Sequence, residues 1–177
     1  PVCGNNVTNM SWAYYYCHSL TGSPVCGNNV TDMYYTYNNC RNLTGSPVCG
    51  SNVTNMESTY RNCVNLTGSP VCGNNVTNMY GTYENCISLT GSPVCGDNVI
   101  NMYRAYWYCD NLTTAVCGPN VTDMTATYQY CRNLTIPVCG ENVINMYATY
   151  CYCNNLTAAV CGPNVTNMSG AYMACMN

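Results

Sequence analysis

The sequence is poor in charge. It contains no lysine and no phenylalanine, four arginines and one histidine among 177 residues. Charged residues make up 6% of the chain, against about 25% in typical soluble domains. A net charge of −3 provides no basic patch, so we expect no nucleic-acid partner. No apolar run approaches the ~20 residues that a membrane-spanning helix requires, so we expect no membrane span.

Residues that perform acid–base or nucleophilic catalysis are sparse and scattered. Catalysis requires at least one positioned acid, base or nucleophile. His18 stands at a position that later repeats fill with Arg, Val, Ile, Asp, Arg and Asn, which indicates a solvated surface. The acids occur singly, at Asp32, Glu57, Glu84, Asp97, Asp110, Asp123 and Glu141. We therefore expect no enzymatic activity and no cofactor.

Internal repetition organises the whole chain. The cysteine of a Val-Cys-Gly triplet recurs with spacings of 23, 23, 23, 23, 22, 22 and 22 residues. These cysteines are Cys3, Cys26, Cys49, Cys72, Cys95, Cys117, Cys139 and Cys161. One such unit is too short to bury its own apolar side chains, whereas stacked units share a continuous core. The sequence predicts a single solenoid over residues 1–177, with repeats that start near 1, 24, 47, 70, 93, 115, 137 and 159.

The apolar positions within one repeat follow a helical spacing. Val7, Met10, Tyr14 and Cys17 stand at offsets 0, +3, +7 and +10, and Leu20 follows. This spacing is typical of one face of a helix. The predicted fold is an α/β repeat solenoid, similar to a leucine-rich repeat, with eight coils of 22–23 residues. Each coil would contain a short strand, a turn and a short helix. The expected core includes Met10, Tyr14, Cys17, Leu20, Met33, Tyr37, Cys40 and Leu43.

The same five positions carry a family resemblance. Val-Thr-Asn-Met, an aromatic residue, a cysteine and Leu-Thr resemble the BspA-like leucine-rich repeats of bacterial surface proteins, which also occur in phage fibre-like proteins. The resemblance implies a leucine-rich-repeat solenoid that works in adhesion or in a fibre, without chemistry. Two features depart from that pattern. Tyrosine replaces the usual phenylalanine in every repeat, and the usual strand is reduced to Gly-Ser-Pro-Val-Cys-Gly.

The cysteines allow more than one interpretation. There are 17, two in each repeat and the additional Cys151. In the Tyr-x-x-Cys set they suit the role of small buried hydrophobic residues. In a secreted protein, disulfides between the two sets would instead staple each coil. A metal site is disfavoured, because there is no Cys-x-x-Cys motif and the only close pair is Cys151 and Cys153.

Asparagine also has two interpretations. The chain contains thirteen Asn-x-Ser/Thr sequons, and glycosylation is one use for them. Candidate sites are Asn6, Asn42 and Asn65. However, Asn98 persists where Ile100 removes the sequon, and Thr21 persists after Ser19. Each residue therefore has its own structural reason. We expect a buried asparagine whose amide pairs with turn backbone in successive coils.

Aromatic residues form the candidate binding surface. The residue after the recurring methionine is tyrosine in half of the repeats, and two tryptophans lie near it in sequence. The candidates are Trp12, Tyr34, Tyr80, Tyr103, Trp107 and Tyr147. Exposed aromatic rings suit sugar stacking, partner docking or lateral packing. In the simpler alternative, these rings only cover the ends of the helices.

These observations favour a non-enzymatic, extracellular structural or adhesive protein, a fibre or filament segment on a cell or virion surface. Low charge permits association, and neither end of the sequence shows a polar capping unit, so self-association end to end or laterally is expected. A host surface protein or glycan is a further expected partner. The main alternative is a receptor- or glycan-binding solenoid. A weaker alternative is ice binding by Thr8, Thr31, Thr54 and Thr77, in a row that Ile100 and Ile144 interrupt.

Overall fold

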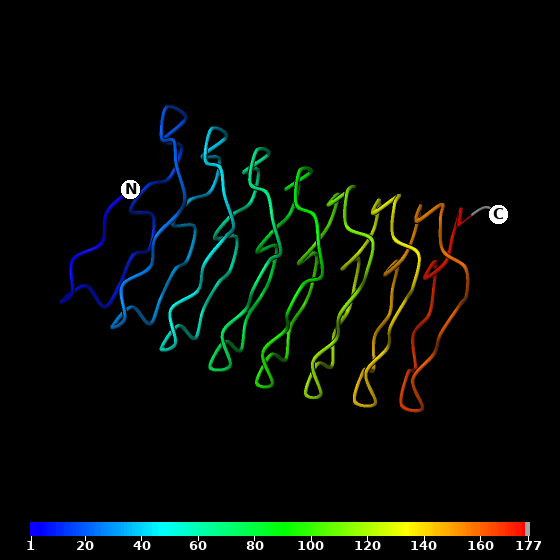
Figure 1. Ribbon diagram of the computed structural model, residues 1–177. Helices are drawn as coiled ribbons and strands as arrows, with labels where there is room; N and C mark the ends of the chain where they lie inside the picture. Colours follow the sequence, from blue (N-terminus) through cyan, green and yellow to red (C-terminus); the bar gives the residue numbers. More distant parts are fainter. Residues whose placement is uncertain (176–177) are drawn as a thin grey trace.

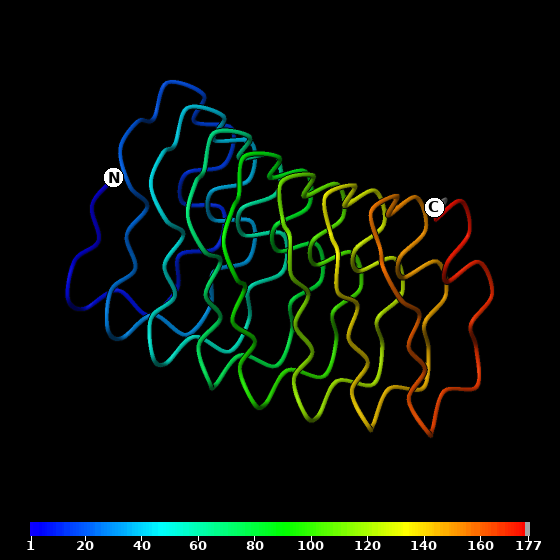
Figure 2. The ribbon, with the colours of Figure 1, turned by 45° about the vertical axis from the view of Figure 1, so that its right-hand side comes forward.

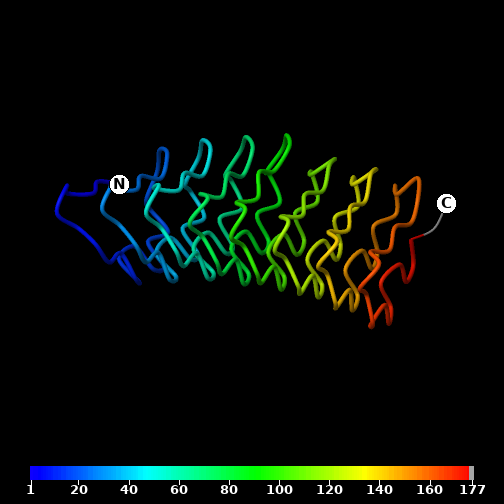
Figure 3. The ribbon, with the colours of Figure 1, turned by 90° about the horizontal axis from the view of Figure 1, so that it is seen from below.

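A computed structural model describes residues 1–175, which form a rod of stacked coils. The coils follow one another in chain order, and the first and last lie at opposite ends of the rod (Figure 1). Each coil is a flattened loop (Figure 2), and the order is kept along the whole stack when it is seen from below (Figure 3). Coils 1 to 8 comprise residues 1–23, 24–46, 47–69, 70–92, 93–114, 115–136, 137–158 and 159–175.

The predicted secondary structure is wrong. Residues 1–175 contain no helix, and their strand content is limited to isolated parallel bridges. The longest row of bridges joins the residue before each recurring methionine: Asn9, Asp32, Asn55, Asn78, Asn101, Asp123, Asn145 and Asn167. No sheet forms in the described part. The expectation of an α/β solenoid with a helix in each coil is therefore overturned, and the absence of helix also conflicts with leucine-rich-repeat architecture.

A chain of turns takes the place of the expected helix. We call it the turn wall: residues 10–17, 33–40, 56–63, 79–86, 102–109, 124–131, 146–153 and 168–175. In coil 2 the N–H groups of Thr36, Asn38 and Cys40 each donate to the carbonyl three residues earlier, at 3.1, 3.3 and 3.0 Å. The third and seventh residues have positive φ, 54° at Tyr35 and 63° at Asn39. A positive φ at the third residue of a turn is typical of type II turns and incompatible with a right-handed helix.

Hydrogen bonding between coils explains why the helix does not form. Four other N–H groups of this wall, at Met33, Tyr35, Tyr37 and Asn39, donate to carbonyls of the following coil at 2.8–3.0 Å. Every second N–H of the wall thus donates along the rod axis, to the next coil. An α-helix requires each N–H to bond four residues back within the segment. Consecutive turns also point the recurring valine, methionine, tyrosine and cysteine inward. They therefore account for the apolar spacing of three, four and three residues without a helix.

The core runs along the axis of the rod. In coil 3, Val53, Met56, Tyr60, Cys63 and Leu66 are completely buried, and coils 2, 4, 5 and 6 repeat this pattern. Coil 1 has a neighbour on one side only. Accordingly its methionine is buried, its tyrosine and leucine are half-buried, and its Tyr-x-x-Cys thiol is exposed. Of the expected core residues, Met10, Met33, Tyr37, Cys40 and Leu43 are buried, whereas Tyr14, Cys17 and Leu20 are less so.

A column of stacked tyrosines occupies the centre of this core. The rings of the recurring tyrosine stack from coil to coil with centroids 5.1–5.7 Å apart. The Tyr128 hydroxyl donates to the Val116 carbonyl at 2.7 Å and accepts the Val116 N–H at 2.8 Å. The hydroxyl thus satisfies peptide groups that have no strand partner. This is a physical reason for tyrosine where phenylalanine was expected.

Coil 5 is an exception to this arrangement. Here Val94 accepts a hydrogen bond from the Cys72 N–H and donates to the Pro70 carbonyl, both at 2.9 Å. Because those bonds occupy the peptide groups of Val94, the buried Tyr106 hydroxyl has no partner. One position of the column therefore lacks the bond that the others make.

All 17 cysteines are free, so the regular disulfides considered above do not form. In the turn wall the Cys63 thiol donates to the Tyr37 carbonyl of the preceding coil at 3.0 Å, and its equivalents repeat this bond. In the Val-Cys-Gly set the thiol packs against the next coil's glycine. A Cβ at Gly50 would lie 2.9 Å from the Cys26 sulfur. Glycine is required there by close approach between coils.

Candidate interaction surfaces

One flat surface of the rod is formed by the residues on either side of the inward valine. We call it the Asn/Thr face. Its amide row is Asn6, Asn29, Asn52, Asn75, Asn98, Asn120, Asn142 and Asn164, and its β-branched row is Thr8, Thr31, Thr54, Thr77, Ile100, Thr122, Ile144 and Thr166. All of these residues are exposed except Thr122, which is half-buried. Neither row contains a charged side chain.

Hydrogen bonds to the preceding coil hold the amide row in place. From coil 2 to coil 8 the asparagine Nδ2 donates to a backbone carbonyl of the preceding coil at 2.8–2.9 Å, as Asn52 does to Asn28. The expected pairing with turn backbone is confirmed. The expected burial is wrong, because these side chains are exposed. The amide row is thus a structural element that remains accessible.

Hydrogen bonds to the preceding coil also hold the β-branched row in place. The Thr54 N–H donates to the Thr31 carbonyl at 2.8 Å, and its hydroxyl donates to the same oxygen at 3.2 Å. Isoleucine keeps the backbone bond, since the Ile100 N–H donates to Thr77 at 3.0 Å. These N–H groups point to the preceding coil, opposite to those of the turn wall. The two isoleucines therefore change the chemistry of the row but not its branched shape.

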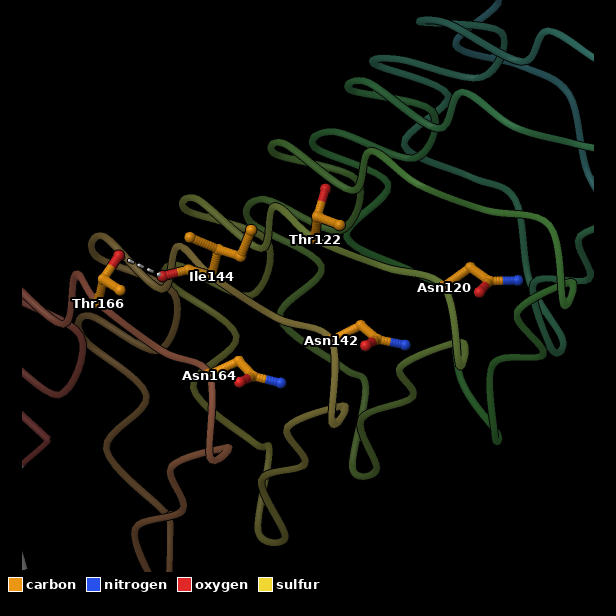
Figure 4. A pocket seen from close by; sticks show the side chains of 6 residues that line it. All are labelled: Asn120, Thr122, Asn142, Ile144, Asn164 and Thr166. Carbon is orange, nitrogen blue, oxygen red and sulfur yellow. Dashed lines mark hydrogen bonds between the residues drawn. The ribbon is translucent and has the colours of Figure 1, made fainter.

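A shallow groove lies between the two rows in the last three coils. It has a volume of about 480 Å³ and is lined by Asn120, Thr122, Asn142, Ile144, Asn164 and Thr166. Figure 4 shows the three amides projecting side by side from successive coils, with the β-branched side chains in a second row. The dashed line is the bond from the Thr166 hydroxyl to the Ile144 carbonyl, 3.4 Å long.

The remaining candidate sequons also have structural roles. The side-chain nitrogens of Asn42 and Asn65 donate to the carbonyls of His18 and Arg41, at 2.8 and 2.9 Å. A glycan would be attached through that same nitrogen. Asn6 lies in the amide row of coil 1 and is exposed. The bonds of Asn42 and Asn65 therefore account for these asparagines without a glycan.

Two of the six aromatic candidates meet at the start of the rod. Trp12 is 46% exposed and stacks on Tyr35 with centroids 4.5 Å apart. Tyr34 meets the edge of Trp12 at 5.4 Å. Tyr15 and Tyr16 extend this aromatic patch across the turn wall. The patch is therefore built mainly from rings that contact one another.

The other four aromatic candidates do not continue that patch. Tyr80 and Tyr103 stack on each other at 4.9 Å and are half-buried. The Arg104 guanidinium lies 5.4 Å from the Tyr103 ring and 5.7 Å from Trp107. Tyr147 is 50% exposed, beyond Thr125 in the same row. The six aromatic candidates therefore form separate groups on the turn wall and not one continuous binding surface.

Ionisable groups are few, and two ion pairs join four of them. Glu84 is buried, and its carboxylate lies 2.9 Å from Arg61. Burial raises the pKa of Glu84, while Arg61 and Arg104 act in the opposite direction. Arg132 lies 3.0 Å from Asp110 on the surface.

The buried thiols of Cys72 and Cys117 are poor nucleophiles, because burial raises their pKa to about 12. Within residues 1–175 no group of three His, Cys, Asp or Glu side chains is arranged to hold a metal ion. The described residues also include no helix of the length and apolarity that crossing a membrane requires.

Sequence reasoning missed one part of the turn wall. In coils 6 to 8 the third turn-wall residue is small, at Ala126, Ala148 and Gly170, and Arg104 holds the same position in coil 5. Together with Gln129 they line a second groove. Comparing the repeats position by position would have shown a single arginine among small residues, because only coils 1 and 2 carry aromatic residues there and coils 3 and 4 carry Ser58 and Gly81.

Comparison of the chain with models of known protein families, with curated proteins and with solved structures found no match in any of the three.

Proposed function

We propose that the chain is a non-enzymatic structural and adhesive rod that works on the outside of a cell or virion. The observation that supports this most directly is the Asn/Thr face. It is exposed, uncharged and repeated in every coil, and from coil 2 onward hydrogen bonds to the preceding coil fix its asparagine and threonine side chains. A surface with this periodicity suits a partner with the same periodicity, and a second copy of the rod is such a partner.

The energetics of association favour this use of the face. Side chains that are already fixed lose little conformational freedom when they bind. Repetition along the axis adds many weak contacts into one stable interaction, provided that both surfaces keep the same register. A net charge of −3 over the whole chain gives little electrostatic repulsion between copies. Lateral self-association through the Asn/Thr face is therefore the expected mode.

A lysine placed on this face tests the proposal. Thr77→Lys introduces a charge into the β-branched row, and we expect it to abolish lateral bundles in negative-stain electron microscopy and to reduce the sedimentation coefficient. Asn154→Lys is the matched control, since it makes the same change at an exposed position where two other coils carry arginine. Bundles that survive Thr77→Lys, or a parent protein that stays monomeric at high concentration, would contradict lateral association through this face.

Ice binding is a second candidate function of the same surface, favoured by one observation. All eight members of the β-branched row carry a methyl-bearing branched side chain at the same place in the coil. The same three samples decide it. Thermal hysteresis in the parent and in Asn154→Lys, but not in Thr77→Lys, would support ice binding, and its absence in the parent would exclude it.

A further inference from the structure

A second groove crosses the turn wall of coils 5 to 8, away from the Asn/Thr face. We call it the Arg104 groove, and its volume is about 430 Å³. Ala126, Ala148 and Gly170 form its floor, Tyr147 and Gln129 line it, and Arg104 stands in the first of these coils. A volume of this size lies within the range that small ligands occupy in proteins.

Small residues at the third turn-wall position line the groove. This residue has positive φ in every coil, 52° at Ala148 and 64° at Gly170. In coil 1 Trp12 has the same conformation, with a φ of 61°, and its ring covers the wall. In coils 6 to 8 the same position carries only methyl groups or hydrogen, and the groove extends over these coils. The groove therefore runs along the axis and suits an extended ligand.

Arg104 is the only charged residue that lines this groove. Its Nε is buried and has no hydrogen-bond partner. Arg104 forms no ion pair in the described part of the chain, although its charge acts on Glu84, whose carboxylate pairs with Arg61. Contact with two aromatic rings fixes the guanidinium plane. A fixed guanidinium without an ion-pair partner suits a carboxylate, whose two oxygens accept two parallel N–H bonds from one edge of the planar donor set.

The other lining residues suit a sugar. Tyr147 is half exposed and offers a ring face on which a pyranose can stack. Gln129 accepts a hydrogen bond from the Trp107 indole N–H at 3.0 Å, which orients its amide beside the groove. Thr125 and Ser169 add hydroxyl groups.

We propose that the Arg104 groove binds an acidic polysaccharide, with the carboxylate of one uronic acid on Arg104 and a neighbouring ring stacked on Tyr147. The proposal uses a different wall from the Asn/Thr face and does not depend on association of the rods. Its ligand class follows from the unpaired guanidinium, the exposed ring and the axial direction of the groove.

Isothermal titration calorimetry with oligogalacturonate tests this site. The fully methyl-esterified oligomer is the matched probe, because it keeps the chain and removes the charge. We expect the parent protein to bind the acid form at least about tenfold more tightly than the ester, a difference typical of one charge-assisted hydrogen-bonded contact. Arg104→Gln should remove that preference, and Arg41→Gln, on another part of the coil, should keep it.

A second variant separates the site from the fold. Ala148→Trp should fill the groove and abolish binding while the rod stays folded, because Trp12 already occupies the equivalent position with the same φ. Circular dichroism checks the fold. Thr77→Lys should bind normally, so failure of the Asn/Thr face and failure of this groove are distinguishable. No binding to the acid form, or binding unaffected by Arg104→Gln and Ala148→Trp, would overturn the proposal.

Discussion

In this rod, tyrosine hydroxyl groups form hydrogen bonds to peptide groups that strand pairing would satisfy in a sheet. The Tyr128 hydroxyl bonds to both peptide groups of Val116, and Tyr150 and Tyr37 make the same pair of bonds to Val138 and Val25. A buried peptide group that loses its partner is costly. Two features therefore favour tyrosine at this position. Its ring stacks in the column, and its hydroxyl bonds to the peptide groups of the valine.

Two matched substitutions test this role. Tyr128→Phe should lower the free energy of unfolding by about 1–3 kcal/mol, because it leaves both peptide groups of the half-buried Val116 without their partner. Tyr106→Phe should have almost no effect or stabilise the protein slightly, because the Tyr106 hydroxyl is buried without a partner. Urea unfolding of the two variants measures the difference. Equal losses of unfolding free energy in the two variants would show that removing the oxygen atom from the packed core, and not the loss of the hydrogen bonds, causes the destabilisation.

At this scale much could be predicted from the sequence. Recurrence of an apolar residue in every repeat correctly placed Met33, Tyr37, Cys40 and Leu43 in the core. Recurrence of an asparagine independent of its sequon predicted a bond to the neighbouring coil, which the structure contains. The asparagine's exposure could not be predicted, because an amide that bonds backbone carbonyls has the same sequence signal whether or not it is covered.

At the scale of the element, the turn wall depends on two left-handed residues in each coil. An L-residue in this conformation is unfavourable by about 1–2 kcal/mol, and glycine is nearly free of that penalty. No β-branched residue occupies either position in any of the eight coils, although threonine is common beside them. The sequence thus avoids the residue type that tolerates positive φ least.

Substitution at Ala148, where φ is 52°, tests this requirement. Ala148→Gly should stabilise the protein by up to about 1 kcal/mol because it removes the left-handed penalty, and Ala148→Val should destabilise it by at least about 1 kcal/mol. Ala105→Gly is the control, since Ala105 has no positive φ, and the same change should destabilise there. Thermal melts of the three variants provide the measurement. Destabilisation by Ala148→Gly would contradict the assignment.

The type of this element could not be predicted from apolar spacing. Offsets of three, four and three residues are shared by a helix face and by consecutive turns, so periodicity alone favours the more common structure. The deciding facts are the positive φ values and the amides committed between coils, and both arise only when coils stack. The Arg104 groove was missed for a related reason, since it depends on residues that become neighbours across coils 5 to 8.

For the whole molecule, the buried thiols determine how stability depends on pH. Burial raises the pKa of Cys72 and Cys117 from 9.0 to about 12, and that of Cys40, Cys49 and Cys95 to about 11. The folded state therefore holds these protons more tightly than the unfolded state. Their contribution to stability is complete below pH 9 and is lost as the pH rises through 11 to 12.

Alkaline titration tests this behaviour. Between pH 8 and pH 10.5 the melting temperature should fall steeply, and each thiol with a pKa near 12 should contribute up to about 2 kcal/mol to the loss at pH 10.5. The same thiols should have no effect between pH 6 and pH 8, which serves as the internal control. A melting temperature that stays constant to pH 10.5 would show that these thiols are not buried as described.

Hydrogen bonds on the two walls of the rod run in opposite directions along its axis. Amides of the turn wall donate to the following coil, and those of the Asn/Thr face donate to the preceding coil. Peptide dipoles on the two walls therefore oppose each other. In an α-helix the dipoles align and leave partial charges at the ends. Here each added coil contributes peptide dipoles of both directions, so the partial charges at the ends of the rod are smaller than aligned dipoles would leave.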